Sequence, residues 1–433
     1  MKGFSIAKFF LISVTLMLAL GVVGTVWAAI QWGPHEEVNV SQNGEASQVA
    51  LSIGAGQKAI AWYVNVESGD RQGDLILAQN AGSGWSTQTI TTTLQSRGPS
   101  LAYSGTALFM VWFQGQQYEE PASAFGGHFW ERYNTGQVRR VTETMFYGSE
   151  EWFRPKLKVA QDGLHLVFAA AVTSTGESPR HLYYAYRPFS SNSWSVAVVV
   201  TSSQVGAGKV FFPDAALGQG QIHIVWEQRA LTPTIYYISG TIGDAGPTWA
   251  APVALSAPDQ NGQQPAIAVD GSGRIHVAWT RYVDHAEQYV LYRRLEGGNG
   301  TEVQYLSGEE GDQYLKVNQI RPTVVWPAIA TGGNQVCVAW HGFYPDSPYE
   351  KEEIFLRCSK DGGTTWGPIL NASRSPDSLS LFPVVAMDAG GVVHLAWEEF
   401  QGGTDYFTNY DAIYAYGLPN IRVFLPLVLR NYR

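Results

Sequence analysis

The stretch PAIAVDGSGRIHVAW, residues 265–279, decides the fold class of this chain. It begins with proline, crosses a glycine-containing turn, and ends in an apolar run that tryptophan closes. Two apolar runs separated by such a turn are typical of antiparallel strands joined as a hairpin. Proline at the start of the first strand is tolerated, because its missing N–H is not needed there. The segment therefore predicts a β-hairpin.

The same pattern occurs seven times along the 433 residues. Each copy is followed by a third strand-like run and a fourth that begins at tryptophan, as in 234–239 and 248–256. Four antiparallel strands in a unit of about 50–60 residues match one blade of a β-propeller. The sequence therefore predicts an all-β, seven-bladed propeller of four-stranded blades. The copies close on Trp62, Trp112, Phe168, Trp226, Trp279, Trp340 and Trp397.

The beginning of the chain supplies a strand that the last repeat lacks. QWGPHEEVNVS (31–41) is similar to TWGPILNAS (365–373), the fourth strand of the sixth repeat. If the N-terminal segment pairs into the last repeat, it closes the ring and removes the open sheet edges. We therefore expect the propeller to cover residues 30–418, closed by an N-terminal strand.

The two ends of the chain differ from the repeats. In residues 1–29, Lys2 and Lys8 precede an apolar run that ends in small residues, the layout of an export signal peptide. The run is also long enough to span a bilayer, so a cleaved signal and an uncleaved membrane anchor remain alternatives. Both place the propeller outside the cytoplasm, secreted or held at the cell surface. Residues 419–433 form a short apolar C-terminal tail.

The net charge and the number of cysteines limit the partners and cofactors that this chain is expected to bind. The formal net charge of −9 disfavours nucleic acid and anionic membranes, so any membrane contact is expected through the N-terminal segment alone. The only cysteines, Cys337 and Cys358, fall on neighbouring predicted strands and could form one disulfide in an oxidising compartment. The sequence predicts a monomer with no metal and no cofactor. Four histidines each lie in a different repeat, too far apart to share an ion: His165, His223, His276 and His394.

One turn carries a family resemblance. SKDGGTTW, from Ser359 to Trp366, resembles the Asp-box of bacterial neuraminidase (BNR) repeats, S-x-D-x-G-x-T-W, at every specified position. Turn chemistry suits these residues, because Asp361 can accept N–H groups and Gly363 can adopt a demanding backbone conformation. The resemblance implies a sialidase-like Asp-box propeller in which these residues are structural. We expect a non-catalytic member.

The resemblance also nominates catalytic residues. Sialidase-like enzymes gather three arginines around a carboxylate and use a tyrosine nucleophile with a carboxylate partner. Arg97, Arg229 and Arg281 would be the arginines, with Tyr282 as nucleophile and Glu227 as its partner. Further candidates for the last two roles are Tyr406, Tyr410, Glu398 and Glu399.

Two departures weigh against catalysis. No aspartate occurs between Asp74 and Asp162, where the acid/base residue is expected, and seven repeats exceed the six blades of a catalytic sialidase domain. We therefore expect a protein that binds glycan or extracellular protein. A sialidase-like glycoside hydrolase and a structural cell-surface scaffold are the alternatives.

Binding is expected on the face that carries the loops before each proline and after each closing aromatic residue. Aromatic rings beside charged groups suit sugars or peptides. Phe212, Trp326 and Phe382 are expected instead to pack at the centre of the ring. The candidate binding residues are Trp152, Arg154, Arg229, Arg281, Tyr282, Tyr344 and Glu398.

Overall fold

The computed structural model describes most of the repeat region, and its regular elements are almost all strands. None of the described segments is a helix long and apolar enough to cross a membrane. A single turn of 3-10 helix, η2 (Pro258–Gln260), is the exception to the strands among the described residues. These residues are 31–32, 35–38, 45–65, 73–117, 125–148, 154–172, 180–201, 209–243, 246–283, 288–297, 299–308, 326–343, 351–402 and 410–418.

The first two repeats share one sheet, because a single long strand serves both. That strand, β6 (Trp85–Ser104), pairs through its first half with β5 (Gly73–Asn80) and through its second half with β7 (Ala107–Gln117). The other strands of this sheet are β3 (Glu45–Ile53), β4 (Lys58–Asn65), β8 (Phe125–Tyr133), β9 (Arg139–Arg140) and β10 (Phe146–Gly148).

The next four repeats each form a separate antiparallel sheet. The third contains β11 (Lys156–Val159), β12 (Gly163–Ala170), β13 (His181–Pro188) and β14 (Val198–Val199). The fourth contains β15 (Lys209–Gly218), β16 (Gln221–Arg229), β17 (Thr234–Thr241), β18 (Thr248–Trp249) and β19 (Val253–Ala254). The fifth contains β20 (Gly262–Val269), β21 (Ile275–Tyr282), β22 (Gln288–Glu296), β23 (Asn299–Gly300) and β24 (Gln304–Tyr305). The sixth contains β25 (Ala328–Gly332), β26 (Gln335–Phe343), β27 (Glu352–Ser359) and β28 (Leu370–Asn371).

The last sheet joins the two ends of the described chain. It contains β29 (Ser380–Met387), β30 (Val393–Phe400) and β31 (Tyr410–Leu418), together with β1 (Gln31–Trp32) and β2 (Glu36–Glu37). Both short strands pair antiparallel with β31, Trp32 opposite Gly417 and Glu36 opposite Tyr414. The N–H of Val38 extends this pairing by donating to the carbonyl of Ala412 at 3.1 Å.

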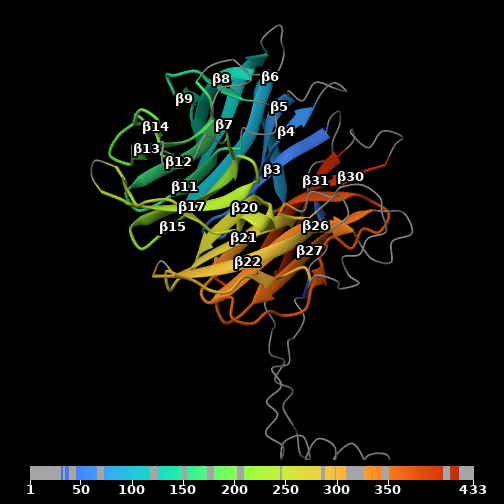
Figure 1. Cartoon of the computed structure of the whole chain (residues 1–433). Helices are drawn as coiled ribbons and strands as arrows, with labels where there is room; N and C mark the ends of the chain where they lie inside the picture. Colours follow the sequence, from blue (N-terminus) through green and yellow to red (C-terminus); the bar gives the residue numbers. More distant parts are fainter. Residues whose placement is uncertain are drawn as a thin grey trace, which may run out of the picture.

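The first strands of the repeats form a closed ring, and the sheets fan outward from it (Figure 1). Contacts run from β3 to β6, then through β11, β15, β20, β25 and β29, and from β29 back to β3. Apolar clusters fill the spaces between neighbouring sheets, and all seven closing aromatic residues are buried in them. Antiparallel sheets arranged in this way around one axis are propeller-like.

The sheets have four, five or eight strands in place of the uniform four that the sequence predicts. The long strand β6 accounts for the eight. In all three five-stranded sheets the outer edge is broken into a pair of two-residue strands, as with β18 and β19 on β17. Pro252 lies between those two, and its missing N–H interrupts the outer strand at that point.

Candidate functional site

The residue that enters a first strand has an unusual backbone conformation in every repeat except the third, where Arg154 stands at this position. Phe212, Trp326 and Phe382, each directly before a proline, have φ of 45°, 35° and 52°. Gln48 and Gln264 occupy the equivalent positions, with φ of 52° and 51°. In β3, β15, β20 and β29, the strand register shifts at this point, as in a β-bulge. Non-glycine residues in the left-handed region are strained, and such strain clusters at functional sites.

These entry residues surround one end of a central cavity of about 230 Å³. Every first strand of the ring contributes a short consecutive segment to the cavity wall. The repeated bulge therefore brings residues from distant parts of the chain to one mouth. The mouth residues are Gln48, Gly98, Arg154, Phe212, Gln264, Trp326 and Phe382.

Four of these residues contact one another across the mouth, and we call them the rim cluster: Arg154, Phe212, Trp326 and Phe382. The ring of Trp326 meets Phe212 edge-on at 4.7 Å and Phe382 at 5.6 Å between centroids. The guanidinium carbon of Arg154 lies 4.3 Å from the centroid of Trp326. Trp326, Phe382 and Arg154 are only partly buried, so aromatic surface and a cation are available together at the cavity mouth.

Two further arginines lie against the ring of Phe211, the residue before Phe212 of the rim cluster. The guanidinium carbons of Arg180 and Arg229 lie 4.4 Å and 4.0 Å from the centroid of that ring. Burial, and then the nearby charge of Arg229, lower the pKa of Arg180 to about 9. Arg229 also lies 5.7 Å from the ring of Phe212, which links this pair to the rim cluster. The arrangement brings two guanidinium groups beside the aromatic rings, and one of them, that of Arg229, is in an ion pair with Glu227.

Two of the sequence-predicted carboxylates hold backbone in place. Glu227 accepts the N–H of Gln264 at 3.0 Å, and Glu398 accepts the N–H of Gln48 at 2.7 Å. In both cases the carboxylate fixes the left-handed entry residue of the next first strand in the ring. Burial raises the pKa of Glu227, although its ion pair with Arg229 opposes this. The sequence signal for this role was available, since each glutamate directly follows a closing tryptophan.

The structure does not bring Arg97, Arg229 and Arg281 into one cavity. Arg281 donates to the hydroxyl of Tyr305, on β24 at the outer part of its own sheet. Arg97 is buried on β6, and none of the three lines the central cavity in the described part of the chain. Arg154 is the arginine that the structure places at the mouth.

The other predicted site residues are placed as follows. The N–H of Tyr282 donates to the carbonyl of Asn261 at 3.3 Å, at the end of β21. The ring of Tyr410 lies 5.6 Å from that of Phe400. Glu399 accepts the indole N–H of Trp397 at 2.8 Å. Outside the described residues lie Trp152, Tyr344, Tyr406, the segment 1–29 and the tail 419–433.

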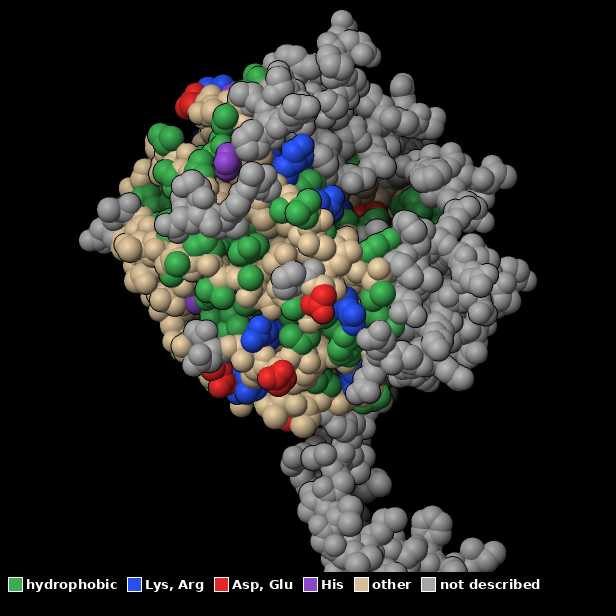
Figure 2. Space-filling view, viewed as in Figure 1, with side chains coloured by type: hydrophobic (Ala, Val, Ile, Leu, Met, Phe, Trp, Pro, Cys, Tyr) green, Lys and Arg blue, Asp and Glu red, His purple; other side chains and the backbone are tan. Residues whose placement is uncertain are grey.

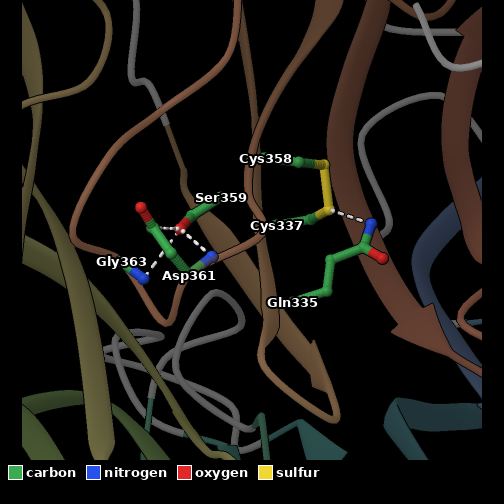
Figure 3. The surroundings of a disulfide bond; sticks show 6 residues. All are labelled: Gln335, Cys337, Cys358, Ser359, Asp361 and Gly363. Atoms are coloured by element: carbon green, nitrogen blue, oxygen red, sulfur yellow. Dashed lines mark hydrogen bonds between the residues drawn. A yellow bond between two sulfur atoms is a disulfide. The ribbon is translucent and has the colours of Figure 1, made fainter. Parts of the chain in front are cut away.

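The SKDGGTTW turn is held by its own side chains (Figure 3). The hydroxyl of Ser359 donates to Asp361 and accepts the N–H of Gly363, both at 2.8 Å. Partial burial raises the pKa of Asp361, but the hydrogen bonds from Thr365 and Ser359 outweigh it and hold that pKa below its usual range. Gly363 has a φ of 78°, which a side chain rarely adopts.

The box tryptophan packs between two sheets. The indole N–H of Trp366 donates to Gln304 at 2.8 Å, and its ring meets Tyr292 at 4.8 Å between centroids. Both partners belong to the preceding sheet. Directly before the SKDGGTTW turn, Cys358 on β27 lies opposite Cys337 on β26, and the two cysteines form a disulfide (Figure 3).

The repeat histidines make a recurring contact inside the sheets. Each accepts or donates one hydrogen bond with a tyrosine hydroxyl on the third strand, at 2.6 to 2.9 Å. Among the described residues, no group of three or more His, Cys, Asp or Glu could hold a metal ion. Cys337 occupies the histidine position in the sixth repeat, where the disulfide replaces this contact. The pairs are His165–Tyr184, His223–Tyr237, His276–Tyr292 and His394–Tyr414.

Comparison with known proteins relates the chain to other structures by fold. No family model and no curated protein matches it. An ulvan lyase of polysaccharide lyase family PL25, solved with the glycan -[GlcA(1-4)Rha3S]-, matches with a TM-score of 0.54 and 10% identity over 87% of this chain and 95% of that chain. A Dyadobacter fermentans protein of unknown function matches with a TM-score of 0.51 and 9% identity, over 90% and 99% of the two chains. The leech intramolecular trans-sialidase has a TM-score of 0.46, 10% identity, and coverage of 96% and 72%.

At these identities, the first two matches show a shared β-propeller fold. Figure 2 shows one face of that fold, on which Lys, Arg, Asp and Glu side chains are interspersed with apolar ones. The charge is therefore not segregated by sign over the visible part of this face.

Proposed function

We propose that this chain is an exported, monomeric, seven-bladed propeller of the sialidase-like Asp-box type that binds an acidic glycan without cleaving it. Each first strand of the ring, together with the strands that pair outward from it, would form one blade. The N-terminal strands β1 and β2 would complete the last blade. The glycan would lie at the mouth of the central cavity.

The rim cluster is the observation that carries the proposal. Trp326 and Phe382 are partly exposed, and aromatic side chains of this kind can pack against the apolar face of a sugar ring. Arg154 lies against the same rings, where its guanidinium could bind a sugar carboxylate or sulfate with two hydrogen bonds. Arg180 adds positive charge nearby, in a chain whose net charge is −9, and Arg229 adds a second guanidinium that is paired with Glu227. The ulvan lyase of the same fold was solved with a glycan that contains GlcA.

The placement of the polar residues favours binding over hydrolysis. Glu227 and Glu398 are engaged by backbone N–H groups of the next first strands, so neither is positioned as a partner for a tyrosine nucleophile. Arg281 contacts Tyr305, away from the cavity. A catalytic site needs its acid, base and charged groups around one reacting atom, and the contacts of Glu227, Glu398 and Arg281 among the described residues support binding instead.

A glycan array probed with the purified full chain tests the proposal. We expect hits among uronate-containing or sulfated glycans, and affinity about fivefold lower for Trp326→Ala, because one stacked ring contributes on the order of 1 kcal/mol. Arg154→Gln is expected to weaken binding and to reduce its dependence on salt.

The matched control is Phe189→Ala. Phe189 is an exposed aromatic residue near the hairpin turn of the third repeat, at the opposite end of the blade from the rim cluster. It is expected to leave binding unchanged. An array without hits, or equal losses in the Trp326 and Phe189 variants, would contradict the proposal. Turnover of a fluorogenic sialoside that is lost in Arg229→Ala would show that the chain is a hydrolase.

A further inference from the structure

Below the mouth, the wall of the central cavity carries an unequal set of charges. Strand β11 contributes Lys156 and Lys158, which point to the same side because residues two apart in a strand share a face. Strand β15 contributes Asp214. The remaining described residues of the lining are uncharged apart from Arg154 at the mouth. The cavity wall therefore carries two ammonium groups and one carboxylate.

The single carboxylate is already engaged. Its Oδ1 lies 3.5 Å from the ammonium of Lys156, and its Oδ2 accepts the N–H of Ile267 on β20 at 3.0 Å. Burial raises the pKa of Asp214, but the two lysines and the backbone N–H groups outweigh it and lower that pKa. Asp214 is therefore an anion that neutralises one lysine and anchors the next first strand.

Lys158 is the second lysine of the cavity wall, and it has no ion pair among the described residues. Its side chain lines the cavity, and no ion pair or hydrogen bond reaches its ammonium from the described residues. Burial lowers the pKa of Lys158, opposed by Asp214 and reinforced by Lys156. Lys158 is half-buried, and the one nearby carboxylate, Asp214, is already paired with Lys156, so an anion bound beside Lys158 would offset the cost of holding its charge away from water.

We propose that the central cavity binds a small inorganic anion between Lys158 and Lys156. The volume of about 230 Å³ is room for several water molecules of about 30 Å³ each, and hence for a partly hydrated halide or oxyanion. The rim cluster narrows the mouth, so the ligand must be small. This site is separate from the glycan site, because it lies inside the ring and involves neither of the stacking rings.

Chloride is the probe, and ³⁵Cl NMR line broadening with the purified full chain is the measurement. We expect saturable excess broadening in the native chain that nitrate displaces. Lys158→Met is expected to weaken chloride binding about tenfold or more, because hydrogen bonds to an ion are worth roughly 1.5–3 kcal/mol. Lys158→Arg is expected to retain it, since the charge remains.

The matched control is Lys360→Met, which removes the same charge from an exposed position in the SKDGGTTW turn. It is expected to bind chloride as the native chain does. Bromide diffusing into crystals of the native chain gives a second measurement, with an anomalous peak expected beside Lys158. The proposal is overturned if the cavity shows no such peak, or if Lys158→Met and Lys360→Met broaden the chloride line equally.

Discussion

Acidification from pH 7 to pH 5 is expected to weaken the fold through His223. This residue is buried on β16, with Nδ1 2.8 Å from the hydroxyl of Tyr237. Burial lowers the pKa of His223 to about 4, against a smaller raising effect from a backbone hydrogen bond with Gly218. In the unfolded chain its pKa is about 6.5. The folded state therefore holds His223 neutral over a range in which the unfolded state binds a proton.

The difference between the two pKa values of His223 determines how the free energy of unfolding changes with pH. The contribution to stability is fully present above pH 6.5 and is lost as the pH falls toward the folded pKa of His223, about 4. Between pH 7 and pH 5, the loss from His223 alone is about 2 kcal/mol. His276 is the comparison, because Asp270 lies 3.1 Å from its Nε2 and partly offsets the lowering of its pKa by burial.

Urea unfolding at the two pH values measures this loss. His223→Gln keeps a neutral polar side chain and is expected to be about 2 kcal/mol less sensitive to the pH change than the native chain. His276→Gln is expected to reduce the sensitivity by less. If His223→Gln loses as much stability between pH 7 and pH 5 as the native chain does, the buried neutral state of His223 is refuted.

Three further outcomes are expected. Gly363→Ala is expected to cost about 3 kcal/mol or more in the free energy of unfolding, since a Cβ there meets the hydroxyl of Tyr292 at 1.8 Å. Gly391→Ala has a similar φ of 77°, but its Cβ would meet only Gln335 Oε1, at an ordinary contact distance of 3.6 Å, so it is expected to cost only about 1–2 kcal/mol. Replacing both cysteines of the Cys337–Cys358 bond, which are 21 residues apart, by alanine is expected to cost about 3 kcal/mol in urea unfolding. Deleting β1 and β2 is expected to expose the edge of β31 and cause concentration-dependent association in analytical ultracentrifugation, and a monomeric, equally stable product would contradict that role.

Much of the backbone arrangement could be predicted from the repeats. The hairpin pattern places the turns and the closing aromatic residues, because alternation and glycine turns are local properties of the sequence. The pairing of Trp32 with β31 could be inferred from its likeness to the fourth strand of the sixth repeat. The sharing of β6 by two repeats could not be predicted, because no local signal separates one long strand from two short ones.

The candidate site was harder to predict, because side-chain direction depends on packing between repeats. The loop position of Arg281 suggested the central face, yet Tyr305 on an outer strand holds its guanidinium. Phe212, Trp326 and Phe382 could be placed near the axis, but their contact with Arg154 depends on the strained φ of each entry residue. The sequence did not indicate that Lys158 lines the central cavity, since a lysine at every second position of a strand ordinarily faces solvent.

The pairing of β1 with β31 determines how the protein responds to mechanical load. Gln31 lies opposite Leu418, so the two ends of the described fold leave the molecule at one point. A force that pulls these ends apart opens the antiparallel pairs one after another, starting at Gln31 and reaching Trp32 and then Glu36. Such unzipping loads only a few hydrogen bonds at a time. Under tension the ring is therefore expected to open first at its closure, at low force, while the other sheets remain folded.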